Sequence, residues 1–166
     1  TDAVDDILDQ WSEARPELET DSLGVVIRIT SLSRALLRQA TDALAPLDLE
    51  LFEYDVLSAL RRQGRPYALP ATGVAKETGL SSGAMTNRID KLESRGFVTR
   101  KADKSDRRTV IVSLTPKGRQ TIDSAIQLRL NAADESLGGL SARERNDLAA
   151  LNRKEKLTGT PEPDEV

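Results

Sequence analysis

The chain has 166 residues, 38% of them hydrophobic and 3% aromatic, which suffices for one domain, or one domain plus an extension, with an aliphatic core. It contains no Cys and no His, so zinc-finger ligand sets, thiol nucleophiles, disulfides and sites that need imidazole are excluded, and we expect neither a metal nor a cofactor. The net charge is −3, the initial TDAVDDILDQ is acidic where a signal peptide would be basic, and no apolar run approaches the roughly 18 residues of a membrane span, so we expect a cytoplasmic protein.

The N-terminal part of the chain is predicted to be helical. Residues 1–20 hold an extra N-terminal helix, which ends at Arg15-Pro16 because proline disfavours its continuation. An apolar stripe predicts a long helix over residues 22–44, inside a segment, 21–50, that we expect to serve as a dimerisation helix.

Residues 51–119 are predicted to form a winged helix-turn-helix domain. Its first helix covers residues 50–63 and ends at Gly64. A second helix is expected over residues 70–78, because Pro70 suits a first turn, and a tight connection joins it to the next helix.

The helix after this connection is predicted to have two different faces. Ser81 or Ser82 caps its start, and Met85, Ile89 and Leu92 recur at helical spacing as an inward face. The opposite face carries small side chains, at Ser82, Gly83, Thr86 and Asn87. Because such side chains allow close approach to base edges, this is the predicted DNA-recognition helix.

A β-hairpin is predicted behind the recognition helix. Gly96 ends the helix, and residues 97–101 and 109–114 both have strand character. The polar loop between them, residues 102–108, carries Lys104, Arg107 and Arg108. The predicted fold class is therefore mainly α: a winged helix-turn-helix with a two-stranded β wing and flanking dimerisation helices.

The charge of the chain is concentrated around this hairpin. Residues 61–120 contain 14 Lys and Arg against 5 Asp and Glu, a net charge of +9, whereas the remaining residues contain 10 and 22, a net charge of −12. Contacts to phosphates supply much of the affinity of protein–DNA complexes. The segregation therefore predicts a basic DNA-binding face on an acidic body.

Two further helices are predicted in residues 120–157. The first begins at Thr115-Pro116 and runs to about residue 137, and a capping box from Ser141 to Glu144 opens the second. Residues 158–166 are predicted to be a disordered tail. In two-fold DNA-binding proteins such flanking helices pack against the partner subunit, so we expect a homodimer; in a monomer, the alternative, they would only cap the core.

The stretch LSSGAMTNRIDKLESRGFVTRKADKSDRRTVIVSLTPKGR, residues 80–119, resembles the MarR (multiple antibiotic resistance regulator) family of bacterial transcription factors. The resemblance rests on the recognition helix, the glycine stop, the Asp106-Arg107-Arg108 wing tip and the Leu-Thr-Pro-Lys-Gly-Arg run in this order, and it extends more loosely over residues 22–157. It implies a homodimer with interleaved terminal helices. A two-fold dimer would bind double-stranded DNA at an inverted-repeat operator.

Eight residues are predicted to contact DNA. Ser82, Thr86 and Asn87 are candidate readers of bases or phosphates, while Ser81 either binds a phosphate with the N–H groups of the helix start or only caps the helix. The family's D-x-R wing implies that Arg108 enters the minor groove, oriented by Asp106. Lys104 and Arg107 are the other basic residues of the wing. We expect them either to contact phosphates or to face only solvent.

A carboxylate in the first helix of the domain suggests an effector site. The residues three and four positions from Asp55 are Leu51, Phe52, Ser58 and Ala59, which predicts a buried carboxylate that needs a cation, and Arg88 is the candidate. The arrangement resembles a MarR subgroup that has an N-terminal extension and responds to urate or trans-aconitate. This resemblance implies a small organic anion bound by Trp11, Asp55, Arg88 and Arg100, with Ser33 where urate-responsive members have His. In the alternative, Asp55 and Arg88 form a structural ion pair and Trp11 is a packing residue.

The sequence can be compared with what three classes of function require: an enzyme, a transcriptional regulator and an architectural DNA-binding protein. An enzyme is disfavoured, because the chain lacks His and Cys and shows no Gly-rich phosphate loop or metal-spaced acid cluster. A transcriptional regulator, a repressor released by a small anion, fits the predicted elements best. An architectural DNA-binding protein without an effector is the alternative.

Overall fold

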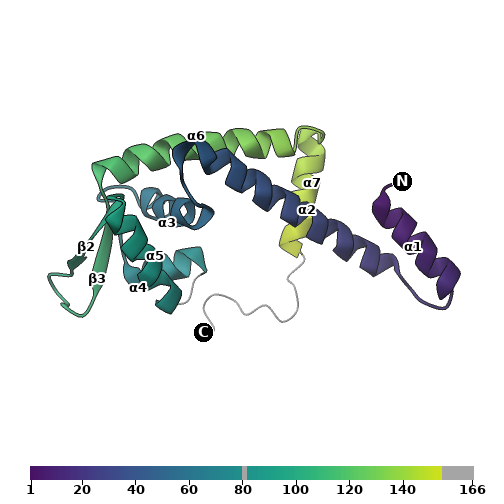
Figure 1. Cartoon of the computed structure of the whole chain (residues 1–166), viewed down its shortest axis with the longest axis horizontal. Coiled ribbons are helices and arrows are strands. Elements are labelled where there is room, and N and C mark those ends of the chain that lie inside the picture. Colours follow the sequence, from purple (N-terminus) through teal and green to yellow (C-terminus); the bar gives the residue numbers. More distant parts are fainter. Residues whose placement is uncertain (80–81, 155–166) are drawn as a thin grey trace. The chain divides into compact units, whose positions relative to one another are not determined.

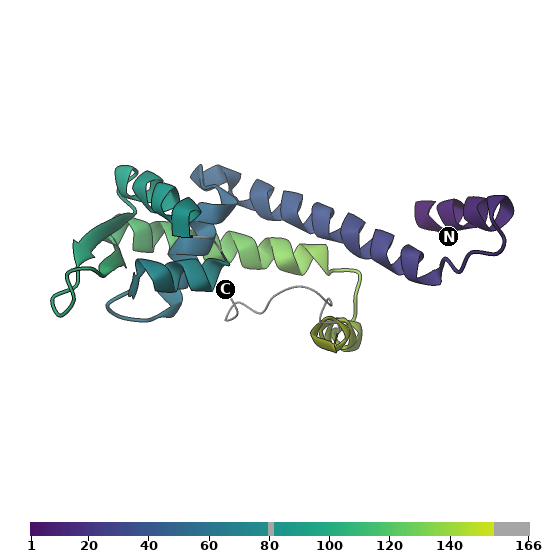
Figure 2. The same cartoon turned by 90° about the horizontal axis from the view of Figure 1, so that it is seen from below.

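The computed structural model describes residues 1–79 and 82–154 (Figures 1 and 2). In these residues it contains helices α1 to α7, a short 3-10 helix η1 and strands β1 to β3. The chain divides into two compact units, Thr1–Asp42 and Ala43–Val166. The predicted fold class, mainly α with a winged helix-turn-helix, is confirmed. Two predictions lie outside the described residues: the cap at Ser81 and the tail at 158–166.

The first unit contains α1 (Ala3–Ala14) and most of α2 (Asp21–Leu44). The side chain of Asp2 caps α1, because its carboxylate accepts hydrogen bonds from the backbone N–H groups of Val4 and Asp5, both at 3.0 Å. Arg28 of α2 donates two hydrogen bonds to Asp2, at 2.8 and 3.0 Å, and forms an ion pair with Asp5. These contacts hold the predicted extra N-terminal helix against α2.

A row of apolar side chains on α2 is exposed. The exposed fractions lie between 37% and 58% for Leu23, Val25, Val26, Ile29, Leu32, Leu36 and Leu37. Most of these residues recur at intervals of three or four, which places them along one broad side of the helix. Contiguous exposed apolar surface of this kind marks an interaction site.

The second unit is built around α3 (Leu51–Arg62), which follows η1 (Ala45–Leu47). Helix α3 packs against α4 (Ala71–Thr78), α5 (Ser82–Ser94), α6 (Pro116–Ser136) and the sheet. Aliphatic side chains, one methionine and one phenylalanine form the buried core, which includes Leu44, Leu57, Leu60, Val74, Met85, Leu92, Phe97, Val98, Val112 and Ile122. The core thus joins the end of α2 to every element of the helix-turn-helix and the wing.

The sheet has three strands, one more than the sequence predicted. Strands β2 (Val98–Ala102) and β3 (Val110–Leu114) form the expected antiparallel hairpin, and β1 (Ala68–Pro70) pairs with the other edge of β3 in the order β1-β3-β2. The prediction of a helix from residue 70 is corrected accordingly, since Pro70 ends β1 and is the N-cap of α4. A proline is tolerated there because β1 is an edge strand.

Helix α6 begins at a close junction with the wing. The hydroxyl of Thr115 accepts a hydrogen bond from the N–H of Gly118 at 2.9 Å and donates one to the carbonyl of Gly96 at 2.7 Å. Gly118 is buried, and a Cβ atom at this position would lie 2.0 Å from the carbonyl oxygen of Phe97. Only glycine lets the two backbones approach so closely.

Helix α7 (Ala142–Lys154) begins with the predicted capping box. The N–H of Ser141 donates to the carboxylate of Glu144 at 2.8 Å, and the N–H of Glu144 donates to the hydroxyl of Ser141 at 3.3 Å. No residue of α7 is buried in this chain.

Replacing Gly118 by Ala is expected to lower the free energy of unfolding by about 1 to 3 kcal/mol, because the added methyl group would overlap the backbone of Phe97. The matched control is Gly139→Ala, where nothing lies within 4 Å of the added atom. Its effect should stay within about 0.5 kcal/mol. Urea unfolding followed by circular dichroism measures both variants, and equal stability of the two would contradict the close junction.

Candidate nucleic-acid interface

Helix α5 has the two faces that the sequence predicted. Met85, Ile89 and Leu92 are at most 2% exposed and belong to the core of the second unit. Thr86 and Asn87 are exposed on the other side of the helix. The side chain of Ser82 and all of Ser81 lie outside what the structure describes. The polar outer face is therefore held in place by the burial of the inner one.

Two carboxylates hold the wing loop that joins β2 to β3. Asp103 accepts hydrogen bonds from the backbone N–H groups of Ser105 and Asp106, at 2.7 and 3.1 Å. Asp106 accepts hydrogen bonds from the N–H of Arg108 at 3.0 Å and from the hydroxyl of Thr109 at 2.9 Å. Such contacts between an Asp side chain and the backbone two or three residues later stabilise tight turns. These hydrogen bonds support the backbone of the loop at both Asp residues.

The contact of Asp106 differs from the one that the family resemblance implied. Its carboxylate binds the backbone of Arg108 and the hydroxyl of Thr109, and in the described part of the chain it forms no ion pair with the guanidinium of Arg108. An Asp two residues before its partner fits a local turn better than a contact between the side-chain ends. Asp106 therefore fixes the backbone from which the exposed Arg108 projects.

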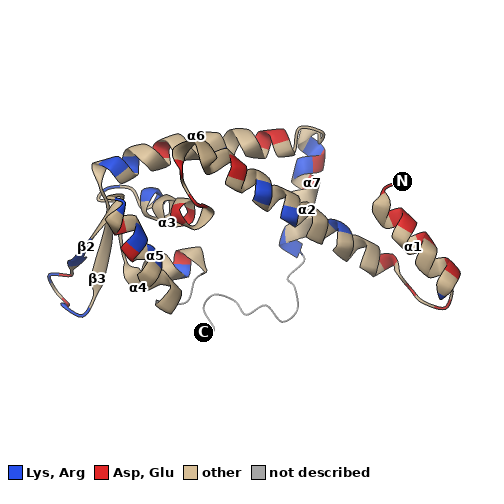
Figure 3. Cartoon of the chain, viewed as in Figure 1, with Lys and Arg blue, Asp and Glu red and all other residues tan. Residues whose placement is uncertain are grey.

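Basic side chains gather around the wing of the second unit. Figure 3 shows Lys and Arg on β2, on the wing loop and at the start of α6. The exposed ones are Arg100, Lys101, Lys104, Arg107, Arg108, Lys117 and Arg119. This surface adjoins α5, because β2 packs against that helix. The winged unit thus presents a polar helix face together with a basic hairpin.

The structure corrects the prediction of a buried carboxylate at Asp55. Asp55 is exposed, and the acid with no exposed surface in α3 is Glu53. The carboxyl group of Asp55 is nevertheless shielded from some of the surrounding water, and this desolvation raises its pKa above the usual range. Three nearby cations oppose the increase without cancelling it, namely Arg129, Arg62 and Arg88. The sequence analysis missed Arg129 and Arg62, which come from α6 and from the end of α3.

The residues predicted to bind a ligand are only partly brought together. The guanidinium of Arg88 lies over the ring of Phe52, 4.8 Å from its centroid, and within the described residues it forms no ion pair with Asp55. Arg100 is tied instead to two acids of α5, Asp90 at 2.5 Å and Glu93 at 2.6 Å. Its hydrogen bonds hold the pKa of Glu93 below the usual range.

Two other predicted ligand residues belong to the first unit. Trp11 lies on α1 with 43% of its surface exposed, and Ser33 lies on α2 and is also exposed. The proposed roles of both residues in ligand binding stay predictions. The alternative role of Trp11, as a packing residue, also stays a prediction.

Glu53 was missed by the sequence analysis, although the sequence contains a signal for it. The residues three, four and seven positions after it are Val56, Leu57 and Leu60, and all three are fully buried. Glu53 is therefore part of the inner face of α3. A charge on such a face needs a partner, and Arg95 supplies it at 2.6 Å.

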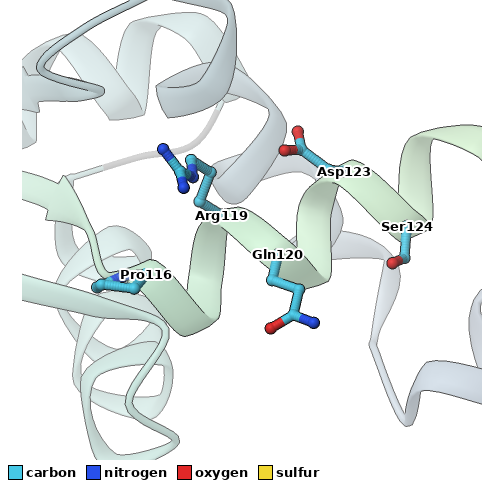
Figure 4. Close-up of a pocket in the computed structure, with 5 residues that line it drawn as sticks. All are labelled: Pro116, Arg119, Gln120, Asp123 and Ser124. Carbon is cyan, nitrogen blue, oxygen red and sulfur yellow. The ribbon is translucent and has the colours of Figure 1, made fainter.

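An open pocket on α6 lies apart from the predicted residues. It has a volume of about 550 Å³ and is lined by Pro116, Arg119, Gln120, Asp123 and Ser124 (Figure 4). Asp123 is neutralised by Arg61 at 2.6 Å. Arg61 and Arg119 both lie over the ring of Tyr67, at 5.0 and 6.0 Å from its centroid. Both charged residues that line the pocket, Arg119 and Asp123, thus have a partner group nearby.

Neither a metal site nor a membrane span is found in residues 1–79 and 82–154. No three carboxylates there are grouped so that they could hold a metal ion. None of the helices there is both long and apolar enough to cross a bilayer.

Comparison with known proteins identifies the family. A model of the MarR family matches residues 49–110, which run from the start of α3 to the start of β3. The HTH-type transcriptional regulator PecS of Dickeya dadantii is 30% identical over 148 residues, which cover 89% of each chain. The chain belongs to the MarR family. It is a DNA-binding transcriptional regulator and not an enzyme.

Two solved structures resemble this fold over most of their length. A mutant of E. coli MarR, complexed with operator DNA, is 27% identical, has a TM-score of 0.70 and covers 87% of this chain and 96% of its own. BpsR of Bordetella bronchiseptica is 25% identical and has a TM-score of 0.71, and the match covers 88% of this chain and 99% of the BpsR chain. DNA binding by BpsR is regulated by 6-hydroxynicotinic acid.

The raised pKa of Asp55 leads to a pH-dependent effect on stability. The folded state holds the proton of this carboxyl group more tightly than the unfolded state, so stability falls as the pH rises from the normal carboxyl range through the raised pKa. Asp55→Asn should therefore raise the melting temperature at about pH 7. The difference in melting temperature between the variant and wild type should shrink toward about pH 4.

Thermal unfolding at several pH values measures this effect. The control is Asp147→Asn on α7, whose side chain is 70% exposed. A lower melting temperature for Asp55→Asn at neutral pH would show instead that the three arginines stabilise the ionised form.

Proposed function

We propose that this MarR-family chain is a homodimeric repressor that binds an inverted-repeat operator and is released by a small organic anion. The observation that supports DNA reading most directly is the exposed polar side of α5 beside a wing loop whose backbone is supported by hydrogen bonds to Asp103 and Asp106. Such a wing and a helix with small polar side chains can enter adjacent grooves of one duplex.

The exposed apolar side of α2 supports the homodimer. Seven large apolar side chains of α2 are each more than a third exposed, and a contiguous apolar surface of this kind is typical of a site that another protein surface covers. Leu130 on α6 and Leu151 on α7 are also exposed, by 56% and 61%. We therefore assign residues 21–50 and 120–157 to dimerisation and 51–119 to DNA binding, with 1–20 as an additional helix.

The proposed DNA contacts follow the two elements. Ser82, Thr86 and Asn87 contact bases or phosphates, and Ser81 binds a phosphate together with the N–H groups of the helix start. Arg108 enters the minor groove from the wing tip, which Asp106 shapes through the backbone. Lys104 and Arg107 contact phosphates.

The environment of Asp55 supports an anionic effector. Arg88, Arg62 and Arg129 act on this carboxyl group, and Arg88 belongs to the DNA-reading helix. An anion that attracts the guanidinium of Arg88 would shift α5 relative to the DNA and lower the affinity. BpsR, whose regulator 6-hydroxynicotinic acid is an organic acid, offers a parallel. Trp11, Ser33 and Arg100 complete the proposed set of ligand residues.

Arg108→Ala is expected to weaken operator binding by about 1 to 3 kcal/mol, the usual size of a lost specific contact. The fold and the dimer should persist, because Arg108 is exposed. Mobility shifts at fixed salt measure the affinity, and Arg15→Ala, directly after α1 and with a side chain 57% exposed, is the control. Footprinting should show an inverted repeat with half-sites about 10 bp apart. Unchanged affinity, or protection of a single half-site by a monomer, would contradict the proposal.

The effector is tested by the same mobility shift across small organic anions, including trans-aconitate, citrate, urate and xanthine. One of them should release the wild-type protein at millimolar concentration. Asp55→Asn and Trp11→Phe should blunt this release and spare basal DNA binding more than Arg88→Ala does, because only Arg88 belongs to α5. Asp147→Asn serves as the control. Operator binding that no anion relieves would favour the alternative, an architectural protein without an effector.

A further inference from the structure

The recognition helix has a third side, which faces the start of α3. Arg88, Lys91 and Arg95 follow one another at intervals of three and four residues, so they lie on the same side of the helix. Arg88 lies over the ring of Phe52 at 4.8 Å, and Lys91 lies over the same ring at 5.2 Å and forms an ion pair with Glu50. Two cations of the DNA-reading helix, and Arg95 directly after its end, are thus turned toward protein.

Arg95 makes the most buried of these contacts. Its Nη1 atom donates to Oε2 of Glu53 at 2.6 Å, and Glu53 has no exposed surface. The same oxygen accepts the backbone N–H of Glu50 at 2.9 Å, while Oε1 has no hydrogen-bond partner among the residues that the structure describes. Because an isolated buried carboxylate is costly, the position of Glu53 depends on the guanidinium.

The same guanidinium also holds the connection between α2 and α3. Its Nη2 atom donates to the backbone carbonyl of Asp48 at 2.6 Å and to its carboxylate at 3.0 Å. Asp48 ends η1 with a φ of 49°, in the left-handed region, so the chain turns sharply there. Leu44, the last residue of α2, is fully buried in the core directly before η1. Arg95 therefore joins the end of the DNA-reading helix to the segment through which α2 enters the domain.

We propose that Arg95 is a positioning residue for DNA recognition, which fixes the direction of α5 relative to the end of α2 and so sets the separation of the two half-sites that the dimer accepts. The inference rests on the proposed homodimer and its inverted-repeat operator. Core packing fixes the rotation of α5 about its own axis, and a planar guanidinium that binds a carboxylate and a carbonyl through separate nitrogens adds a constraint on the direction of the helix end.

The first test is Arg95→Lys. Lysine keeps the charge beside Glu53. Its single ammonium group cannot replace the two guanidinium nitrogens that donate to Glu53 and to Asp48 at the same time. Binding is measured on the footprinted operator, on the same operator with one base pair inserted or removed between the half-sites, and on a random duplex. Wild-type protein should prefer the natural spacing. In the variant, the ratio of the affinity for the natural spacing to the affinity for the altered spacings should be about tenfold smaller than in wild type. The affinity for the random duplex should be unchanged.

The second test is the double variant Glu53→Gln with Arg95→Met. It removes both charges, so no buried carboxylate is left without a cation, and its melting temperature should stay close to that of wild type. Its preference for the natural spacing should nevertheless fall as in Arg95→Lys. Arg15→Lys, directly after α1 and with a side chain 57% exposed, is the control that makes the same chemical change outside the segments assigned to dimerisation and DNA binding.

The outcomes separate this inference from the proposed function. If wild-type protein shows no preference among the three operators, the dimeric reading of an inverted repeat is wrong, and the proposal for Arg95 fails with it. If wild type discriminates and both folded variants discriminate equally well, Arg95 is a structural residue only. Unfolding of both variants would likewise assign Arg95 to stability and overturn the positioning role.

Discussion

The structure depends on the burial of one side of α5 in the core. Met85, Ile89 and Leu92 are almost fully inaccessible to water, and burying a side chain of this size contributes about 1.5 to 3 kcal/mol. Since these residues leave the helix at intervals of three and four, their burial fixes its rotation about its own axis. The direction in which Thr86 and Asn87 point is therefore a consequence of core packing.

Not every cation of the basic segment is available to DNA. Lys91, Arg95 and Arg100 are engaged with carboxylates of the protein, and so are Arg61 and Arg62 near the end of α3. The net charge of residues 61–120 therefore overstates the number of phosphates that this unit can neutralise. The exposed cations without a carboxylate partner among the described residues include Lys104, Arg107 and Arg108 of the wing loop, where the proposed DNA contacts lie.

Periodicity and glycine positions predicted the helices and the hairpin, because each long element repeats its signal over several turns. The strand β1 has only three residues, which is too short for any alternation to show. The buried carboxylate was predicted at Asp55 but belongs to Glu53. Two positions along a helix rotate a side chain by more than half a turn about the axis, so this small error in sequence places the carboxylate on the opposite side of α3. The contact of Asp106 was missed for another reason: it depends on a local turn, which the family pattern does not specify.

The wing loop has a consequence for the rates of binding. A mobile loop would lose about 1 to 2 kcal/mol of backbone entropy per residue when it became ordered in a groove, and the hydrogen bonds to Asp103 and Asp106 reduce this cost for the wing loop. In the proposed complex, the same two carboxylates would bring negative charge close to the phosphates and oppose part of the attraction of the wing cations. The lower ordering cost favours fast docking, and the opposing charge favours fast dissociation.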